Sequence, residues 1–197
     1  MNKQNSLFQA YLDNLQNHIS QIDTNVLQKI ADILLLAYKS RKTIYIIGNG
    51  GSASTASHIA CDLSKTVRGH KGDSTYLGFK VNCLSDNVGL ITAWANDAGY
   101  EKIHSGQLEN LGENGDVLIA ISSSGNSNNI LQCVKTAKKL KMNSIGIAGF
   151  KGGKLKELCD LSLVCDSEEY GPVEDIQLII NHAITNYFIN TLKKESK

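Results

Sequence analysis

The chain has 197 residues, of which 42% are hydrophobic, and its 20 basic residues nearly balance its 19 acidic ones. A net charge of +1, spread over short basic clusters, argues against a nucleic-acid partner, and no apolar run of about 18 residues is present to cross a membrane. The five cysteines form no Cys-x-x-Cys pair, so we expect reduced thiols in a cytoplasmic protein that folds as one domain over residues 1–197.

Residues 1–40 predict two leading helices. Apolar residues recur with helical spacing from Leu7 to about Ser40. The pattern is interrupted at Asp23, Thr24 and Asn25, which are typical helix N-cap residues. We therefore expect one helix to end, and the next to begin, at this point.

After these helices, strand-like apolar runs alternate with helix-like segments. In chain order we expect a strand Thr43–Ile47, a helix Ser52–Lys65, a strand Tyr76–Leu84, helices Asn87–Asn96 and Glu101–Leu111, a strand Val117–Ile121, a helix Asn128–Leu140, a strand Ser144–Ala148, a helix Lys154–Leu158 and a strand Leu161–Cys165. A polar, glycine-containing segment, Arg68–Asp73, precedes the second strand. This alternation predicts an α/β fold in which helices cover both faces of a parallel sheet.

A long helix is predicted at the C-terminal end, where Pro172 precedes the run from Val173 to Leu192. Its apolar residues form a stripe that is wider than one core-facing surface needs. We therefore expect this helix also to pack against another subunit.

Two glycine- and serine-rich loops are the most informative feature of the chain. The first, GNGGSASTASH, spans Gly48–His58, and the second, SSSGNSNNI, spans Ser122–Ile130; each follows a predicted strand. A strand that turns directly into a helix leaves backbone N–H groups and the positive end of the helix dipole free to bind an anion. Serine hydroxyls add further donors, so the two loops together predict a phosphorylated ligand.

The first loop permits two other interpretations. Its segment Gly48–Ala53 matches the G-x-G-x-x-A of dinucleotide-binding folds, but the stretch near Arg68 is basic and polar where such folds place an acidic residue. Neither loop carries the lysine of a Walker motif. An ordinary glycine-rich turn is the remaining alternative, and the serine-rich second loop makes it less favoured.

The motifs GNGGSA-x-x-A-x-H and S-x-SGNS-x-N-I, with the pair Asn96–Asp97 and a histidine in the last helix, resemble the sugar-isomerase (SIS) domain of phosphoheptose isomerases. The resemblance covers nearly the whole chain. It implies a three-layer αβα sandwich with a five-stranded parallel sheet, leading helices used in oligomerisation, and a homotetramer with active sites between subunits. The implied reaction converts sedoheptulose 7-phosphate to D-glycero-D-manno-heptose 7-phosphate, for lipopolysaccharide or capsule heptose biosynthesis. The substrate-binding positions implied by the family are Asn49, Gly50, Gly51, Ser52, Asn96, Asp97, Ser122, Ser123, Ser124, Ser127 and Glu174.

A histidine and a carboxylate, His58 and Asp62, are four residues apart on the helix after the first loop, so both project from one face. This spacing suits metal ligands or an acid–base pair, and it is also common in surface ion pairs. In the resembling family a helix histidine, an acid four residues later, a glutamine and a last-helix histidine bind zinc. The resemblance therefore implies one zinc per subunit, held by His58, Asp62, Glu174 and His182.

The chain departs from the family pattern at three positions. Asp62 stands where the family usually has glutamate, Glu174 replaces a glutamine, and Gln177 occupies a position that usually carries histidine. In addition, Glu174 and His182 lie about 12 Å apart along an ideal helix, which is far for two ligands of one metal. Either Glu174 sits on an irregular turn before the helix, or His182 serves the site of a neighbouring subunit.

Aldose–ketose isomerisation moves one proton between two carbons and another between two oxygens through an enediol. We expect Asp62 to be the carbon base and His182 the acid–base partner on oxygen. The competing interpretation is a non-catalytic SIS protein that binds a phosphosugar and regulates a partner, as in the factor that associates with the replication initiator, because the fold alone does not separate the two. The presence of both Asp62 and His182 favours the enzyme.

Overall fold

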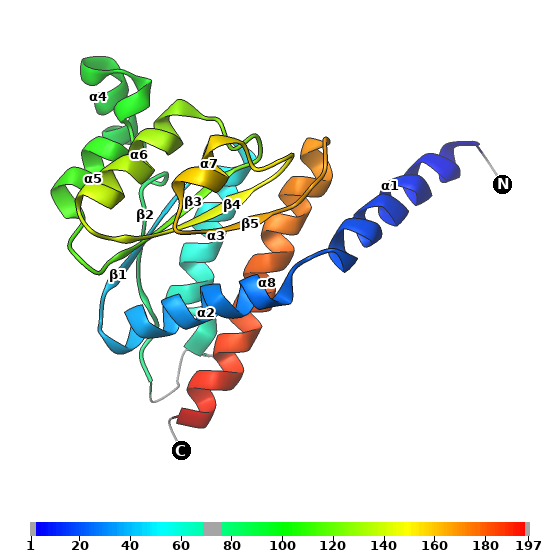
Figure 1. Cartoon of the computed structure of the whole chain (residues 1–197), viewed down its shortest axis with the longest axis horizontal. Helices are drawn as coiled ribbons and strands as arrows, with labels where there is room; N and C mark the ends of the chain where they lie inside the picture. The colour runs from blue at the N-terminus through cyan, green and yellow to red at the C-terminus, as the bar shows by residue number, and fades with distance from the viewer. Residues whose placement is uncertain (1–2, 69–75, 196–197) are drawn as a thin grey trace.

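A computed structural model of the chain describes residues 3–68 and 76–195 (Figure 1). At its centre is a five-stranded sheet in the order β2-β1-β3-β4-β5, in which every neighbouring pair is parallel. The strands are β1 (Thr43–Ile47), β2 (Lys80–Cys83), β3 (Val117–Ser122), β4 (Asn143–Ala148) and β5 (Leu161–Val164). The expected α/β fold with a five-stranded parallel sheet is confirmed.

Helices precede, connect and follow these strands. They are α1 (Lys3–Ser20), α2 (Thr24–Lys39), α3 (Gly51–Ser64), α4 (Val88–Ala98), α5 (Ser105–Leu111), α6 (Asn128–Lys139), α7 (Gly153–Leu158) and α8 (Tyr170–Glu195), with short 3-10 helices η1 (Thr66–Arg68) and η2 (Tyr100–Lys102). The two leading helices and the long C-terminal helix are therefore confirmed. No described helix has the length and the apolar character that a bilayer span requires.

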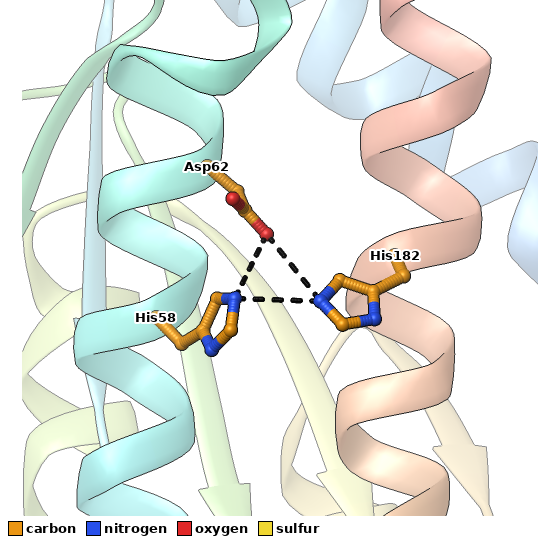
Figure 2. A group of neighbouring side chains, drawn as sticks. All are labelled: His58, Asp62 and His182. Carbon is orange, nitrogen blue, oxygen red and sulfur yellow. Dashed lines mark hydrogen bonds and ion pairs between the residues drawn. The ribbon is translucent and has the colours of Figure 1, made fainter. Parts of the chain in front are cut away.

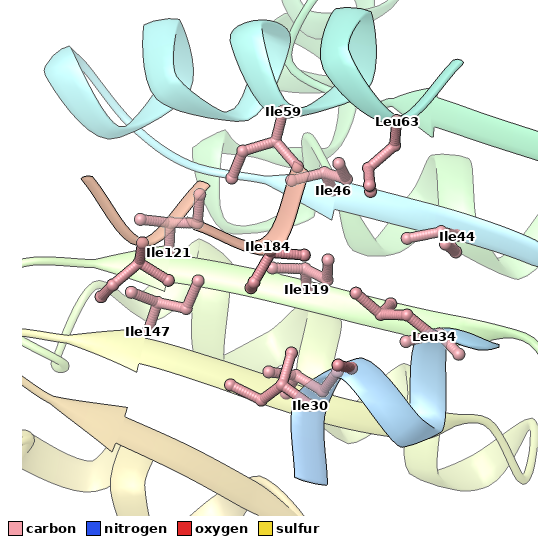
Figure 3. Close-up of a cluster of buried hydrophobic side chains, with 14 of the residues drawn as sticks. Ile30, Leu34, Ile44, Ile46, Ile59, Leu63, Ile119, Ile121, Ile147 and Ile184 are labelled. Carbon is pink, nitrogen blue, oxygen red and sulfur yellow. The ribbon is translucent and has the colours of Figure 1, made fainter. Parts of the chain in front are cut away.

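One face of the sheet is covered by α2, α3 and α8 (Figure 1). Its core is almost entirely aliphatic: Ile44, Ile46 and Ile119 of the strands meet Leu34 of α2 and Ile184 of α8 (Figure 3). Burial of such side chains is the main favourable term in folding, so this core fixes α8 against α3.

The opposite face of the sheet packs against the helices that follow β2 and β3. Tyr45, Leu118 and Ala120 point to this face and contact Ile130 and Val134 of α6. Successive strand residues point to opposite faces, so each central strand supplies both cores. This double burial explains why the strands read as continuous apolar runs in the sequence.

The first helix, α1, stands away from the rest of the molecule (Figure 1). The predicted break before α2 is confirmed, because Asp23 is the N-cap and accepts hydrogen bonds from two backbone N–H groups of the first turn. The hydroxyl of Tyr11 donates to Asp175 of α8 at 2.6 Å and tethers α1. The side chains of Leu7 and Phe8 are both 73% exposed, so α1 has little apolar contact of its own within the chain.

The strand expected over Tyr76–Leu84 is wrong at its start, because β2 begins only at Lys80. The preceding residues pack on the end of α3 instead, where the backbone N–H of Phe79 donates to the carbonyl of Leu63 at 3.0 Å. Of the polar segment expected over Arg68–Asp73, residues 69–73 lie outside the described residues.

The single helix expected over Glu101–Leu111 is also wrong, because the chain forms η2 and then α5, which begins at Ser105. His104 lies at the break and is only 1% exposed. Gly106 lies against Trp94, since a Cβ on this glycine would be 2.7 Å from the indole ring. Tertiary packing thus breaks a segment whose apolar spacing suggested one helix. The other predicted boundaries lie close to the observed ones.

The strand order determines where a ligand can bind. β1 has β2 on one side and β3 on the other, so the direction of chain progression across the sheet reverses between β1 and β3. At such a point the loops that leave the carboxyl ends of the two strands diverge and leave a crevice between them. The loops that follow β1 and β3 are the two glycine- and serine-rich loops.

Candidate active site

The two loops meet at this crevice and form a pocket of about 140 Å³. Its lining consists of Asn49, Ser52, Ile121, Ser122, Ser123, Ser124, Ser127, Tyr170 and Glu174. None of these described residues is basic, and one of them, Glu174, is a carboxylate. An anion in this pocket would therefore be held by hydroxyl, amide and backbone N–H donors and not by an ion pair.

The carboxylate of Glu174 lies over the start of α3. Gly50 is the N-cap of this helix, has a φ of +54° and provides no side-chain cap. A Cβ on Gly51 would lie 2.5 Å from Oε2 of Glu174, so glycine permits this close approach. The helix dipole favours negative charge at this position, which explains why an acidic side chain is accommodated here.

Side-chain amides connect the two loops. Asn49 and Asn129 exchange two hydrogen bonds, of 2.9 and 2.8 Å, and Asn129 is almost fully buried. Gln177 of α8 contacts both loops: the hydroxyl of Ser52 donates to its Oε1 at 3.0 Å, and its Nε2 donates to Oγ of Ser123 at 3.3 Å. The loops are therefore joined directly and also through α8.

A second group of polar side chains lies further along the same helices. His58 and Asp62 project from α3, and His182 projects from α8 toward them (Figure 2). Nε2 of His58 lies 3.4 Å from Oδ2 of Asp62 and 3.3 Å from Nε2 of His182, and the distance from His182 to Oδ2 of Asp62 is 3.9 Å. Asp62 is buried, whereas both histidines are exposed.

This donor set fits a divalent metal ion. Ligand atoms in a tetrahedral zinc site with bonds near 2.0–2.1 Å lie roughly 3.3 Å from one another. Two of the three separations match that value, and all three ligand atoms lie within 4.8 Å of one another. Three nitrogen and oxygen ligands that leave one position open are typical of catalytic zinc sites. His58, Asp62 and His182 could therefore hold zinc from within one chain.

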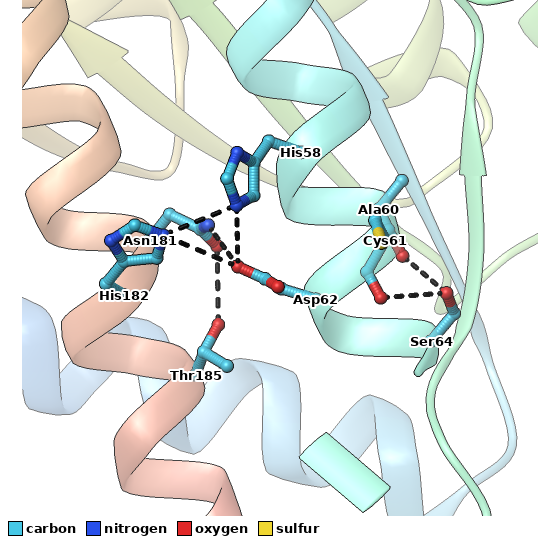
Figure 4. A network of polar contacts seen from close by, with 8 residues as sticks. All are labelled: His58, Ala60, Cys61, Asp62, Ser64, Asn181, His182 and Thr185. Carbon is cyan, nitrogen blue, oxygen red and sulfur yellow. Dashed lines mark hydrogen bonds and ion pairs between the residues drawn. The ribbon is translucent and has the colours of Figure 1, made fainter. Parts of the chain in front are cut away.

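Asp62 is held in place by a polar face of α8 (Figure 4). Nδ2 of Asn181 donates to Oδ2 of Asp62 at 2.7 Å, and the hydroxyl of Thr185 donates to Oδ1 of Asn181 at 3.4 Å. All three residues are buried. Because a carboxylate in a buried position is costly without hydrogen-bond donors, Asn181 both stabilises and orients Asp62.

The structure brings three of the four expected metal ligands together and places the fourth, Glu174, in the serine pocket. The alternative in which Glu174 sits on an irregular turn is wrong, because α8 is already helical from Tyr170. Glu174 is thus eight residues before His182 on a continuous helix, about 12 Å along its axis. A ligand role for Glu174, and a role for His182 in a neighbouring subunit, stay predictions.

Four expected substrate-binding residues do not line the pocket: Gly50 and Gly51, at the start of α3, and Asn96 and Asp97. Asn96 and Asp97 are exposed near the end of α4, where Nδ2 of Asn96 donates to Oδ1 of Asp97 at 2.7 Å. Just beyond α4, the hydroxyl of Tyr100 donates to Oδ1 of Asn49 at 3.2 Å, which links this region to the first loop. Contact between the substrate and Asn96 or Asp97 stays a prediction.

A buried histidine lies beneath the first loop. His104 is 1% exposed, and burial lowers its pKa from 6.5 to about 4. The backbone at Gly48 and Leu84 acts in the opposite direction and offsets only part of this effect. His104 is therefore neutral at pH 7 and packs as an uncharged side chain under the loop.

Two buried polar residues near the site, Asn181 and Thr185, have no place in the sequence-based prediction, whereas the buried Asn129 belongs to the motif of the second loop. On α8, Gln177, Asn181 and Thr185 follow one another at four-residue intervals and so share one face. That spacing, in a helix otherwise rich in apolar residues, is the signal that could have identified a polar face toward α3.

Comparisons with known proteins point to one family. The SIS domain family model matches residues 8–149. A phosphoheptose isomerase of Helicobacter hepaticus is 35% identical over 179 residues, which cover 91% of this chain and 88% of that protein. One of Clostridium acetobutylicum is 36% identical over 158 residues, with 80% and 78% covered. A solved phosphoheptose isomerase structure from Neisseria gonorrhoeae has a TM-score of 0.84 at 26% identity and covers 94% of this chain and 97% of its own.

Proposed function

Because this chain belongs to the phosphoheptose isomerases of the SIS domain family and is a phosphosugar isomerase, we propose that it interconverts sedoheptulose 7-phosphate and D-glycero-D-manno-heptose 7-phosphate. One observation carries the proposal: α3 and α8 contribute both to the serine pocket, through Ser52, Tyr170 and Glu174, and to the group His58, Asp62 and His182. One end of the site is suited to a phosphate and the other to proton transfer.

The spacing along the helices supports a long substrate. Ser52 and His58 are six residues apart on α3, about 9 Å along its axis, and Gln177 and His182 are five apart on α8, about 7.5 Å. A ligand whose phosphate binds the serines while its carbonyl end reaches Asp62 must carry these groups at opposite ends. A seven-carbon ketose phosphorylated on its last carbon has this arrangement.

We assign the proton transfers to two side chains. Asp62 removes a proton from C1 of the ketose and returns it at C2, and His182 moves a proton between O1 and O2 as the enediol forms and collapses. Asn181 keeps the Asp62 carboxylate oriented for this step. His58, Asp62 and His182 would hold one zinc ion per subunit, which would supply Lewis-acid stabilisation of negative charge on the substrate oxygens. The proton transfers would then fall to the second carboxylate oxygen of Asp62 and the second ring nitrogen of His182.

We also propose a homotetramer with active sites between subunits. Two helices support it: α1 exposes Leu7 and Phe8 to solvent, and α4, although strongly apolar, has no buried residue. Apolar helix surfaces of this kind are typical of subunit interfaces. Residues 1–40 would then serve in assembly, and Asn96 and Asp97 at the end of α4 would complete a neighbouring site. Five free cysteines, four of them buried, support a reducing compartment such as the cytoplasm.

The test is to incubate the protein with sedoheptulose 7-phosphate in deuterated water, with and without a chelator, and to follow the sugar by NMR. The proposal expects the aldose to appear with deuterium at C2, and expects the chelator to slow the reaction. Binding of the sugar phosphate without aldose formation and without deuterium exchange would contradict it and would favour a non-catalytic sugar-phosphate sensor.

A further inference from the structure

Gln177 is a buried amide that the proposed chemistry does not use. It is 1% exposed on α8 and lies between Ser52 of the first loop and Ser123 of the second. The two serines are 71 positions apart in the chain, whereas Gln177 is 125 and 54 positions from them. Together with the Asn49–Asn129 pair, hydrogen bonds to this one side chain therefore fix the separation of the loops that form the pocket.

The amide also makes the two serines chemically unequal. The hydroxyl of Ser52 donates its hydrogen bond to Oε1 of Gln177, so Ser52 presents lone pairs to a ligand. Oγ of Ser123 accepts a hydrogen bond from Nε2 of Gln177, so the hydroxyl of Ser123 can donate its own hydrogen bond to a ligand. A phosphate group has only acceptor oxygens when ionised, whereas a sugar hydroxyl can donate. Ser123 is thus suited to phosphate and Ser52 to a sugar hydroxyl.

The direction of the hydrogen bonds between Gln177 and the two serines is important because the pocket has few donors for an anion. Among the described residues that line it there is no basic side chain, and Glu174 contributes negative charge. An anion therefore depends on neutral donors, of which the Ser123 hydroxyl is one. A carboxylate at position 177 would accept hydrogen bonds from both serines, so neither hydroxyl could donate to an anion. A histidine would gain a second N–H donor when it is protonated. A glutamine keeps one donor and one acceptor at every pH at which the protein folds.

We propose that Gln177 is a positioning residue of the phosphosugar site, which joins the two loops and directs the Ser123 hydroxyl toward the phosphate and the Ser52 oxygen toward a sugar hydroxyl. The proposal rests on the proposed function in that it takes the pocket to bind a sugar phosphate. It concerns ligand binding and leaves the assignment of the proton-transfer groups unchanged.

The first test compares Gln177→Met with the matched control Gln107→Met. Gln107 is also buried, at 4% exposure, but within the described part of the chain its amide donates to the backbone carbonyls of Leu84 and Ile103 and to neither loop. Calorimetry with sedoheptulose 7-phosphate should show a Kd about 10-fold higher for Gln177→Met and within about two-fold of wild type for Gln107→Met. In turnover, KM should rise while kcat stays within about three-fold. Gln177→Glu should bind more weakly still.

A double-mutant cycle tests whether Gln177 acts through Ser123. In a Ser123→Ala background, the additional change Gln177→Met should weaken binding by much less than the about 10-fold expected in wild type. Full additivity would show that Gln177 is only a structural residue and would overturn the proposal.

A third measurement does not depend on any Gln177 variant folding. Ser123→Ala should weaken binding of inorganic phosphate, while Ser52→Ala should weaken binding of the sugar phosphate and leave inorganic phosphate binding unchanged. Equal effects of the two serine variants on inorganic phosphate would contradict the inference and leave the proposed function intact. A wild-type chain that binds no sugar phosphate would overturn both.

Discussion

Nδ2 of Asn181 lies 2.7 Å from Oδ2 of Asp62, the same carboxylate oxygen that both histidines of the site face. Asn181→Leu would remove this donor while keeping the side chain's size. We expect kcat to fall roughly 10-fold, because outer partners of this kind orient the groups that contact the substrate or metal. The milder change Thr185→Val, one hydrogen bond further away, should have a clearly smaller effect. Equal kcat values for Asn181→Leu and wild type would show that Asp62 needs no such support.

The proposed base can be tested by Asp62→Asn. This variant keeps the shape of the side chain and its contact with α8 but cannot accept a proton from carbon. Solvent deuterium exchange into sedoheptulose 7-phosphate should be lost, while binding of the sugar phosphate stays measurable by calorimetry. Exchange at the wild-type rate would mean that the base is another residue.

Zinc binding should depend on three side chains from two helices. His58→Ala and His182→Ala should each weaken zinc affinity by about 100-fold or more, because a tetrahedral site then retains only two protein ligands. Calorimetry with zinc alone, without substrate, measures this. The control is His18→Ala on α1, which is outside the group and should leave zinc affinity unchanged. Wild-type affinity in both site variants would place the metal elsewhere.

Gly125 in the second loop should tolerate no side chain. Its φ is +64°, and a Cβ there would lie 2.0 Å from the backbone oxygen of Gly152. We expect Gly125→Ala to lower the free energy of unfolding by about 2–4 kcal/mol, measured by urea denaturation. Gly89→Ala on α4 is the control, because its nearest neighbour is a side-chain oxygen at 3.3 Å, and it should change stability by less than about 0.5 kcal/mol.

His104 should make stability depend on acid pH. Its folded pKa of about 4 lies below its ordinary value of 6.5, so between these values the unfolded chain binds more protons than the folded one. The free energy of unfolding therefore carries no penalty from His104 above about pH 6.5. It falls as the pH drops toward 4, by up to about 3 kcal/mol. Urea unfolding from pH 7 to 4.5 should therefore show a shallower decline for His104→Gln than for wild type. Parallel curves would contradict this origin.

The site could be predicted from sequence wherever a local pattern fixes it. The two loops follow strands and start helices, so the positions of Ser52 and Ser123 at one edge of the sheet follow from parallel strand order. The four-residue spacing of His58 and Asp62 likewise places both on one helix face. These features depend on residues close together in the chain, and the structure retains them.

Other features depend on contacts that no local pattern records. β2 starts late because Phe79 is bonded to the end of α3, and the helix expected from Glu101 is broken where His104 is buried. The partners of Gln177 in the two loops and the partner of Asn181 on α3 are likewise more than 50 positions away in the chain. Helical spacing alone showed α8 as an apolar element, and only its packing against α3 reveals the polar face.

The position of α8 at the end of the chain has a consequence for synthesis. His182, Gln177 and Asn181 all lie on this helix, and each completes a contact with α3, which is made more than 100 residues earlier. Because domains are made from the N-terminus onward, a nascent chain carries both glycine- and serine-rich loops before α8 can join them. Under the proposed function, fragments that end before α8 lack His182, Gln177 and Asn181, so we expect them to bind metal and sugar phosphate more weakly than the finished polypeptide.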